Sequence, residues 1–448
     1  MPKAIYKLGW ANRNPDHVDY PTRTRQLLAN IQAGESDPIP LYMQLIDLFV
    51  DTEDWSQVVR HGNKQLALVD KAKHVAGKYH VLKALAQASR TVGSLGAAIA
   101  FSTRYVSLAK AQGNAEELVD AYLELGLAEI AQGESSDGLP QDFRSAQTSF
   151  RNALDAIKQS TTISSKDAKR IQGEITMNVG ICLKSLGQID EAMRYFTRAL
   201  EVFQGLKLLA YQANAYCNIA ICFDAKHDAK RALESGLVEL ALRRQERDST
   251  GELQAIIDNG HRLSALGRYA DAFENYELAQ KLAAELEDDE SEDSAKRFAS
   301  TAKEHLKALE EIVRLKASLG SARGNSAQFS ILANLVKSYL FLGRGLNARL
   351  DLNEQIRLAK AMNLPSSETA LLSLNLGLAY ELEGNFADAV LALVDGLKNM
   401  SATSNYATQV EWKQALLRVL ISNEAVIIEA NLVIQPNREI DIRNNPHL

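Results

Sequence analysis

The feature that most constrains the fold is a pair of short amphipathic segments in residues 173–200, which meet at Gly187. Apolar and small residues recur in both segments at the spacing of one helix face. They are Val179, Gly180 and Leu183 in the first segment, and Ile189, Ala192, Phe196, Ala199 and Leu200 in the second. The small residues allow two antiparallel helices to approach closely, and the large ones fill the space between them. This stretch therefore predicts a helical hairpin.

Related hairpin patterns recur along most of the chain. The turn positions 53, 93 and 133 are 40 residues apart, and so are positions 187, 227 and 267. The pattern places further units at 38–73, 76–111, 115–158, 210–246, 251–285, 325–362 and 366–400. An insertion at residues 134–142 interrupts the third unit. We therefore predict an all-α chain in which residues 38–285 hold units one to six and residues 325–400 hold units seven and eight.

The segments outside these units lack the hairpin pattern. Residues 1–37 contain three prolines and no clean period, which predicts an extended N-terminal arm that either docks onto the repeats or a partner, or is disordered. Residues 286–324 open with an acidic run at 287–293 and predict an acidic loop followed by a long helix or a degenerate repeat. The acidic run is either a solvated loop or a surface for a basic partner. Residues 401–433 predict a C-terminal capping helix, and 434–448 a loose tail.

Composition narrows the class of protein and its surroundings. The net charge of −6 argues against nucleic acid as a direct partner. The three cysteines cannot all pair within the chain, which favours a reducing compartment. No apolar run approaches the length of a membrane span, and the first residues lack the apolar core of a signal peptide. We expect a cytoplasmic protein, with the nucleus as the alternative, and no membrane partner.

The hairpin at 173–200 resembles the tetratricopeptide repeat (TPR), a helix-turn-helix unit. The longer 40-residue variant has second helices ending in SLAKAQGN (107–114), ELALRRQERD (239–248) or RLAKAMNL (357–364). This repeat pattern is similar to the long repeats of Pins-type spindle-orientation adaptors and Tonsoku-like proteins. It is also similar to the repeats of ciliary proteins and bacterial peptide-responsive regulators. The resemblance implies a right-handed α-solenoid of about eight helical hairpins that binds a partner's peptide along its concave face.

The first helix of each unit lines the inner groove in such arrays, and one position there recurs as asparagine. The residues are Asn178, Asn218, Asn334 and Asn375, with Asp258 in the sixth unit. An amide offers donors and an acceptor, which suits the backbone of an extended peptide. Chaperone-binding TPR domains use an asparagine at this position together with nearby cations, for which Lys184 and Lys337 are the closest candidates, at a different spacing. The alternative is that these asparagines hydrogen-bond the adjacent unit.

Basic and polar residues mark a second candidate surface. Lys83, Gln87 and Arg90 share the groove face of the second unit, and His261 could extend a positive stripe. Such a stripe would receive acidic side chains of a partner, with affinity that falls as salt rises. The alternative is an ordinary solvated face.

The cysteines do not indicate a metal site, and the sequence contains no known catalytic motif. Cys182 and Cys222 are expected to pack as small apolar residues, and Cys217 to be exposed in the groove. No metal site and no cofactor are expected, because no further cysteine or histidine lies at ligand spacing. Nucleotide-binding glycine loops and the common hydrolase motifs are absent from the sequence.

The sequence thus predicts a non-catalytic scaffold or adaptor that binds a peptide segment of a partner protein. The alternative is a permanent structural subunit of a large assembly, such as an axonemal or cytoskeletal complex. A third hypothesis is a regulator of an enzyme, in which the array changes its curvature when it binds a short peptide. The oligomeric state stays open.

Overall fold

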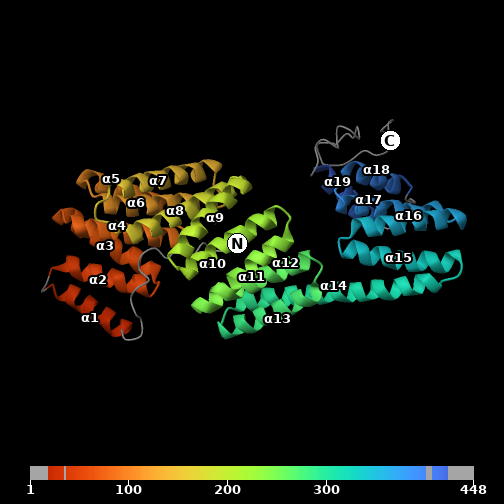
Figure 1. The fold of residues 1–448 in the computed structure, drawn as a ribbon, viewed down its shortest axis with the longest axis horizontal. Helices are drawn as coiled ribbons and strands as arrows, with labels where there is room; N and C mark the ends of the chain where they lie inside the picture. The colour runs from red at the N-terminus through yellow and green to blue at the C-terminus, as the bar shows by residue number, and fades with distance from the viewer. Residues whose placement is uncertain (1–18, 35–36, 400–405, 422–448) are drawn as a thin grey trace. The chain divides into compact units, whose positions relative to one another are not determined.

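The structure is a computed structural model that describes residues 19–34, 37–399 and 406–421. Helices joined by short connections make up these ranges, and no strand occurs within them (Figure 1). The prediction of an all-α fold is confirmed.

Most of the described helices follow one another in pairs joined by short connections, at the positions of the predicted units. Their bounds are α2 (Pro38–Asp51) with α3 (Trp55–Ala72), α4 (Val75–Thr91) with α5 (Leu95–Gln112), α6 (Ala115–Gly133) with α7 (Pro140–Gln159), α8 (Ser165–Ser185) with α9 (Ile189–Gly205), α10 (Leu209–Ala225) with α11 (Ala229–Glu246), α12 (Ser249–Ala265) with α13 (Tyr269–Glu285), α15 (Asn325–Phe341) with α16 (Gly345–Ala361), and α17 (Ser366–Leu382) with α18 (Phe386–Asn399). The remaining described helices are α1 (Tyr20–Ala33), α14 (Asp289–Ser321) and α19 (Tyr406–Ile421).

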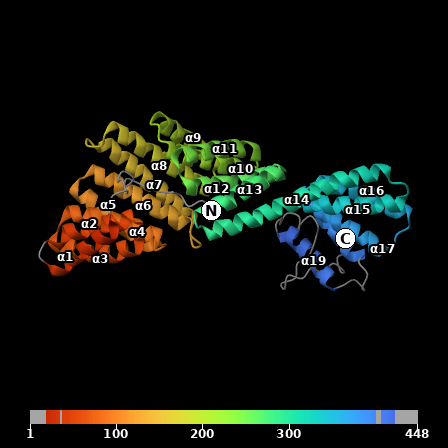
Figure 2. The same ribbon diagram turned by 90° about the horizontal axis from the view of Figure 1, so that it is seen from below.

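The described residues form two compact units. The first comprises residues up to 267 together with 278–292, and the second comprises 268–277 together with the residues from 293 onward. Within the first unit, the first helices of neighbouring hairpins lie side by side: α2 beside α4, α4 beside α6, and α8 beside α10 (Figure 2). The pair α6 and α8 packs less closely than these.

Close approach within a hairpin depends on the small residues that the sequence pattern singled out. A Cβ atom on Gly180 would lie 2.7 Å from Cε1 of Phe196, which is fully buried between α8 and α9. Burying a phenylalanine of this kind contributes about 1.5–3 kcal/mol. The glycine therefore makes room for the ring of Phe196.

The tight turns fall where the repeat predicts them, with one exception. Gly187 has a φ of +76°, and Glu53 and His227 take the same left-handed conformation at the equivalent turns. The predicted turn at Gly133 is wrong, because α6 continues to that residue and the connection follows it. A Cβ on Gly133 would lie within 3.0 Å of three ring atoms of Phe143. This glycine serves the close packing of α7 on α6 instead of a turn.

Part of the predicted extended arm is helical. Residues 20–33 form α1, whose N-terminus is capped by the Asp19 carboxylate, 3.1 Å from the amide nitrogen of Thr22. Pro21 suits the first turn, Gly34 ends the helix in a left-handed conformation, and Leu27 is buried. The expectation of extended chain is therefore corrected for 20–33, whereas residues 1–18 lie outside the described residues.

The acidic run at 287–293 begins a helix instead of forming a loop. Glu287 has a φ of +55°, and the Asp288 carboxylate accepts a hydrogen bond from the Ser291 amide at 3.1 Å. Residues from Asp289 onward lie in α14, where carboxylates in the first turn interact favourably with the helix dipole. One continuous 33-residue helix then extends to Ser321.

Residues 406–421 of the predicted capping segment form α19. Leu416 and Leu420 are fully buried and belong to one apolar cluster with Leu393 and Val394 of α18. Residues 422–433 of that segment and the predicted loose tail at 434–448 lie outside the described residues.

Candidate functional site

A pocket of about 350 Å³ opens in the first unit, between α4, α6 and the start of α8. The connection from α7 to α8 contributes to its wall. The lining residues are Lys83, Glu116, Val119, Asp120, Leu123, Glu124, Thr162, Ile163, Ser164, Asp167, Arg170 and Ile171. Three of the contributing elements are first helices of their hairpins, the helices that the sequence analysis expects to face a ligand.

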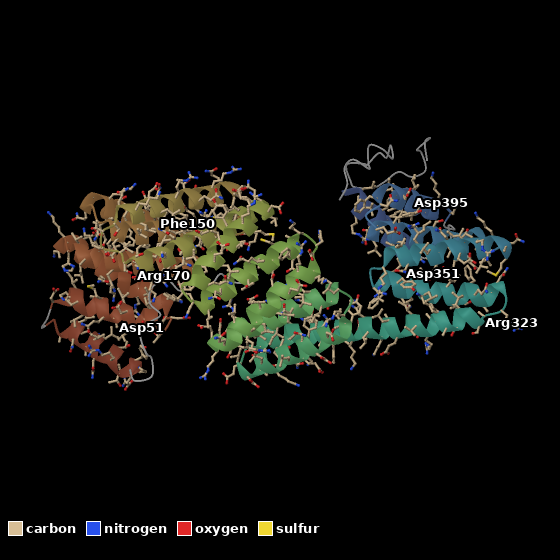
Figure 3. All side chains as sticks on the ribbon, viewed as in Figure 1. Asp51, Phe150, Arg170, Arg323, Asp351 and Asp395 are labelled. Carbon is tan, nitrogen blue, oxygen red and sulfur yellow. The ribbon has the colours of Figure 1, made fainter. Side chains whose placement is uncertain are left out.

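The two cations of the lining are already engaged by carboxylates. The Lys83 ammonium donates to the Asp120 carboxylate, which joins α4 to α6. Arg170, which Figure 3 labels, lies on α8. Its guanidinium donates to Glu174 one turn along the helix, and its Nε lies 3.9 Å from Asp167. The lining holds four carboxylates, on Glu116, Asp120, Glu124 and Asp167, against these two cations. Two residues outside the lining, Glu174 and Arg90, form ion pairs with Arg170 and Glu124, which brings the count to five carboxylates against three cations. The unbalanced charge of the site is therefore negative.

Glu124 forms the buried part of the pocket wall and is 3% exposed. Glu124 forms an ion pair with Arg90, whose Nη2 lies 3.7 Å from Oε2 of Glu124, and this oxygen has no hydrogen-bond partner among the described residues. Burial raises the pKa of Glu124, and the nearby Arg90 and Lys83 oppose that rise. A buried carboxylate oxygen without a donor is unfavourable, so this atom is ready to accept a hydrogen bond from a ligand.

A tyrosine fixes the neighbouring carboxylate on α6. The hydroxyl of Tyr105 on α5 donates to Glu117. Burial, followed by the charges of Asp120 and Glu117, raises the pKa of Tyr105, so the hydroxyl remains a donor. Burial also raises the pKa of Glu117. The hydrogen bond holds Glu117 toward α5, and Glu117 is not among the lining residues.

The carboxylates of this pocket were not predicted from the sequence. Glu116, Asp120 and Glu124 are each four residues apart, which puts them on one face of a helix. That spacing is a signal visible in the sequence. The basic patch proposed at Lys83 and Arg90 has to be corrected, because these cations lie beside Asp120 and Glu124 and are not available as an open positive stripe. Gln87 is half-buried on the same helix.

The predicted asparagines occupy different environments. Asn178 is 3% exposed and its side chain lies inside the repeat packing. Asn218 is half-buried, accepts a hydrogen bond from Lys184 at 3.2 Å and donates to the carbonyl of Asn214 at 2.9 Å. Asn334 is exposed and Asn375 half-buried, both in the second unit. A common peptide-binding role for the four asparagines stays a prediction.

The other predicted groove residues are also separated. The Asp258 carboxylate accepts from Gln254 at 3.0 Å, and burial raises the pKa of Asp258. His261 and Lys337 are exposed, on α12 and α15. None of these three lines the pocket between α4, α6 and α8.

A second polar cluster joins α10, α11 and α12. The Arg243 guanidinium donates to Asn214 at 2.6 Å and to Asp248 at 2.9 Å. The Arg262 guanidinium donates to Asp224 at 3.0 Å and to Asn259 at 3.1 Å. Both arginines are buried, so these bonds cross-link neighbouring helices.

The cysteines are buried side chains. Cys182 and Cys222 are fully buried in the apolar cluster of the first unit, which confirms their predicted packing. Cys217 is 9% exposed, so the expectation of an exposed thiol is wrong. Burial raises the pKa of all three thiols.

Two absences hold for the described part of the chain. No group of three or more histidine, cysteine, aspartate or glutamate side chains there is placed to hold a metal ion. Among the helices of the same ranges, none combines the length and apolar character needed to span a membrane.

Comparison with known proteins identifies the repeat type. Residues 174–204, which cover about half of α8 and nearly all of α9, match the family model of the tetratricopeptide repeat. No curated protein matches the chain. The chain thus contains a tetratricopeptide repeat where the sequence pattern is clearest, and the narrower resemblance to Pins-type and Tonsoku-like proteins stays a prediction.

Several solved structures resemble the chain. Apo RapI shares 11% identity over 81% of this chain and 97% of its own, with a TM-score of 0.48. The Rap conjugation gene regulator of plasmid pLS20, solved with the Phr* peptide, shares 13% identity over 90% of this chain and 96% of its own, with a TM-score of 0.44. BtubC from P. vanneervenii shares 16% identity over 60% of this chain and 92% of its own, with a TM-score of 0.37.

Proposed function

We propose that this tetratricopeptide repeat chain is a non-catalytic adaptor that binds a segment of a partner protein in the pocket between α4, α6 and α8. The observation that carries the proposal is the pocket itself, with a volume of about 350 Å³ on the first helices of three hairpins. That volume lies in the range of pockets that hold small ligands or single side chains. Its position fits the inner-face binding that the sequence analysis expects.

The lining favours recognition over catalysis. Apart from its charged groups, the pocket offers four apolar side chains and two hydroxyls. The hydroxyl of Thr162 donates to Glu116 at 3.1 Å, and that of Ser164 donates to Asp167 at 2.5 Å. Neither histidine nor cysteine is among the lining residues. Such a set can fix and orient a bound side chain, and it lacks the nucleophile–base pair of hydrolytic sites.

A second candidate, a permanent subunit of a larger assembly, draws on a different surface. Leu346 and Leu350 lie one turn apart on α16 and are 52% and 56% exposed. Exposed apolar side chains at this spacing suit burial against another protein. The two candidates use different units of the chain and can be tested separately.

The adaptor proposal is tested by selecting random displayed peptides on the purified chain and measuring their affinity. We expect binders that Thr162→Trp weakens strongly, because Thr162 is an exposed residue at the pocket wall. The matched control is Thr197→Trp, an exposed threonine on α9 that does not line the pocket. Failure to select any binder, or equal effects of both variants, would overturn the proposed site.

A further inference from the structure

We propose that the pocket between α4, α6 and α8 selects a cationic side chain, lysine or arginine, of the bound segment. This inference rests on the proposed function and adds the chemistry of the ligand. It follows from charge balance, from one buried carboxylate oxygen and from the apolar side chains of the wall.

The charge balance favours a positive guest. Asp120 and Glu174 already accept hydrogen bonds from Lys83 and Arg170, the two cations of the lining. Glu116 and Asp167 at the rim accept hydrogen bonds from neutral hydroxyls, and Asp167 also lies 3.9 Å from Nε of Arg170. An anionic guest would have to displace Asp120 from Lys83 while facing the other carboxylates. A cationic guest meets unbalanced negative charge without breaking an existing pair.

Glu124 gives a second, independent reason to expect a cationic guest. It is 3% exposed and lines the pocket, and its Oε2 has no hydrogen-bond partner among the described residues. Arg90 forms an ion pair with Glu124, but its Nη2, at 3.7 Å, is beyond hydrogen-bonding distance of this oxygen. An ammonium or guanidinium of the guest would donate the missing hydrogen bond, and hydrogen bonds between charged groups are the stronger kind.

The wall suits a long side chain that ends in a charge. Val119, Leu123 and Ile171 are buried and lie among the carboxylates of the lining. Lysine and arginine pack their aliphatic stems on apolar surface and keep the charged group at a polar site. A short cation would forgo the apolar contact, and a long apolar side chain would leave the Glu124 oxygen without a donor.

The test starts from the peptides selected for the adaptor proposal. We expect lysine or arginine to recur at one position, and replacement of that residue by glutamine to weaken binding about tenfold or more. Glu124→Gln should weaken the parent peptide by a similar factor and leave the glutamine-substituted peptide unchanged. Asp190→Asn is the control, because Asp190 on α9 forms an exposed ion pair with Lys226, which directly follows α10, and neither residue lines the pocket.

Glu124 is buried, so a second variant guards against a loss caused by misfolding. Glu116→Gln combined with Asp167→Asn changes only exposed residues of the lining. It should reduce the affinity of the cationic peptide several-fold and reduce its dependence on salt.

The outcomes separate the two proposals. Binders without a lysine or arginine preference, or a preference that survives both the Glu124 and the rim variants, would overturn the cationic guest and leave the adaptor function standing. Absence of any binder would overturn both.

Discussion

The ammonium of Lys184 on α8 lies 3.2 Å from the amide oxygen of Asn218 on α10 and donates a hydrogen bond to it. Both residues were predicted from the sequence to line a partner-binding groove. In the structure they bind one another across two adjacent hairpins. Asn218 also donates to the carbonyl of Asn214, so both ends of its amide are engaged within the chain.

This pairing predicts a role in stability for Asn218. We expect Asn218→Ala to reduce the free energy of unfolding by about 1–2 kcal/mol, because it removes two hydrogen bonds in a half-buried position. A double-mutant cycle with Lys184→Met, followed by chemical denaturation, should show coupling between the two residues. Additive effects of the two changes would contradict the pairing. A loss of peptide affinity without a loss of stability would restore the groove assignment.

The packing of α8 on α9 predicts a cost for enlarging Gly180. Gly180→Ala would place a Cβ 2.7 Å from the ring of buried Phe196, and overpacking of this kind costs about 1–3 kcal/mol. Gly205→Ala is the matched control, since Gly205 lies in α9 and a Cβ there meets no atom within 4 Å. Alanine is the better helix former, so the control should be neutral or slightly stabilising. Thermal unfolding of both variants checks this, and equal effects would refute the close approach.

The cluster at α10–α12 predicts a pH dependence of stability. Burial raises the pKa of Glu239 to about 7, with Arg243 and Arg262 opposing the rise and Asp258 adding to it. Between its ordinary pKa of 4.5 and this value, the folded chain holds a proton that the unfolded chain releases. The contribution of Glu239 to stability is therefore present below that window and is lost as pH rises through it.

A glutamine at position 239 isolates this effect. We compare the free energy of unfolding of Glu239→Gln with that of the parent. The difference, variant minus parent, should be larger at about pH 8 than at about pH 5, by up to about 3 kcal/mol from linkage. Denaturation at both pH values measures the change, with the exposed Glu201→Gln as control. A parent–variant difference that does not change with pH would contradict the raised pKa.

Lys83 provides a test that distinguishes a cationic from an anionic guest by the direction in which the peptide affinity changes. Lys83→Met removes the partner of Asp120 and should destabilise the chain by about 1.5–3 kcal/mol. It also leaves a further carboxylate unpaired in the pocket, so the affinity for lysine or arginine peptides should rise several-fold. Lys226→Met removes the exposed partner of Asp190 and should change neither property. Weaker binding in Lys83→Met, measured by titration with the same peptide, would indicate an anionic guest.

The hairpins were predictable from sequence because each depends on contacts between residues close along the chain. Ala192, Phe196 and Ala199 repeat at helix spacing, and Gly180, which faces Phe196, lies in the adjacent helix. Gly133 was misread because a glycine that permits close packing and a glycine that permits a turn look alike in one sequence.

The site was much less predictable. Lys83 and Asp120 are 37 residues apart, and only the packing of α4 on α6 brings them together. Asparagine does recur at one position of the first helices, yet the sequence alone could not show that Lys184 donates a hydrogen bond to Asn218. Burial of Glu124 without a hydrogen-bond partner at Oε2 is likewise a property of three packed helices, not of any local motif.

The turns between helices provide a last, reciprocal prediction. Gly187 and His227 occupy equivalent turns with φ values of +76° and +56°. A side chain in this conformation costs roughly 1–2 kcal/mol, whereas glycine loses more backbone entropy on folding, by about 0.5–1 kcal/mol. Gly187→Ala should therefore destabilise the chain by about 1 kcal/mol, and His227→Gly should stabilise it by about 0.5 kcal/mol. Chemical denaturation of the two variants checks both signs, and stabilisation by Gly187→Ala would show that this turn does not require the left-handed conformation.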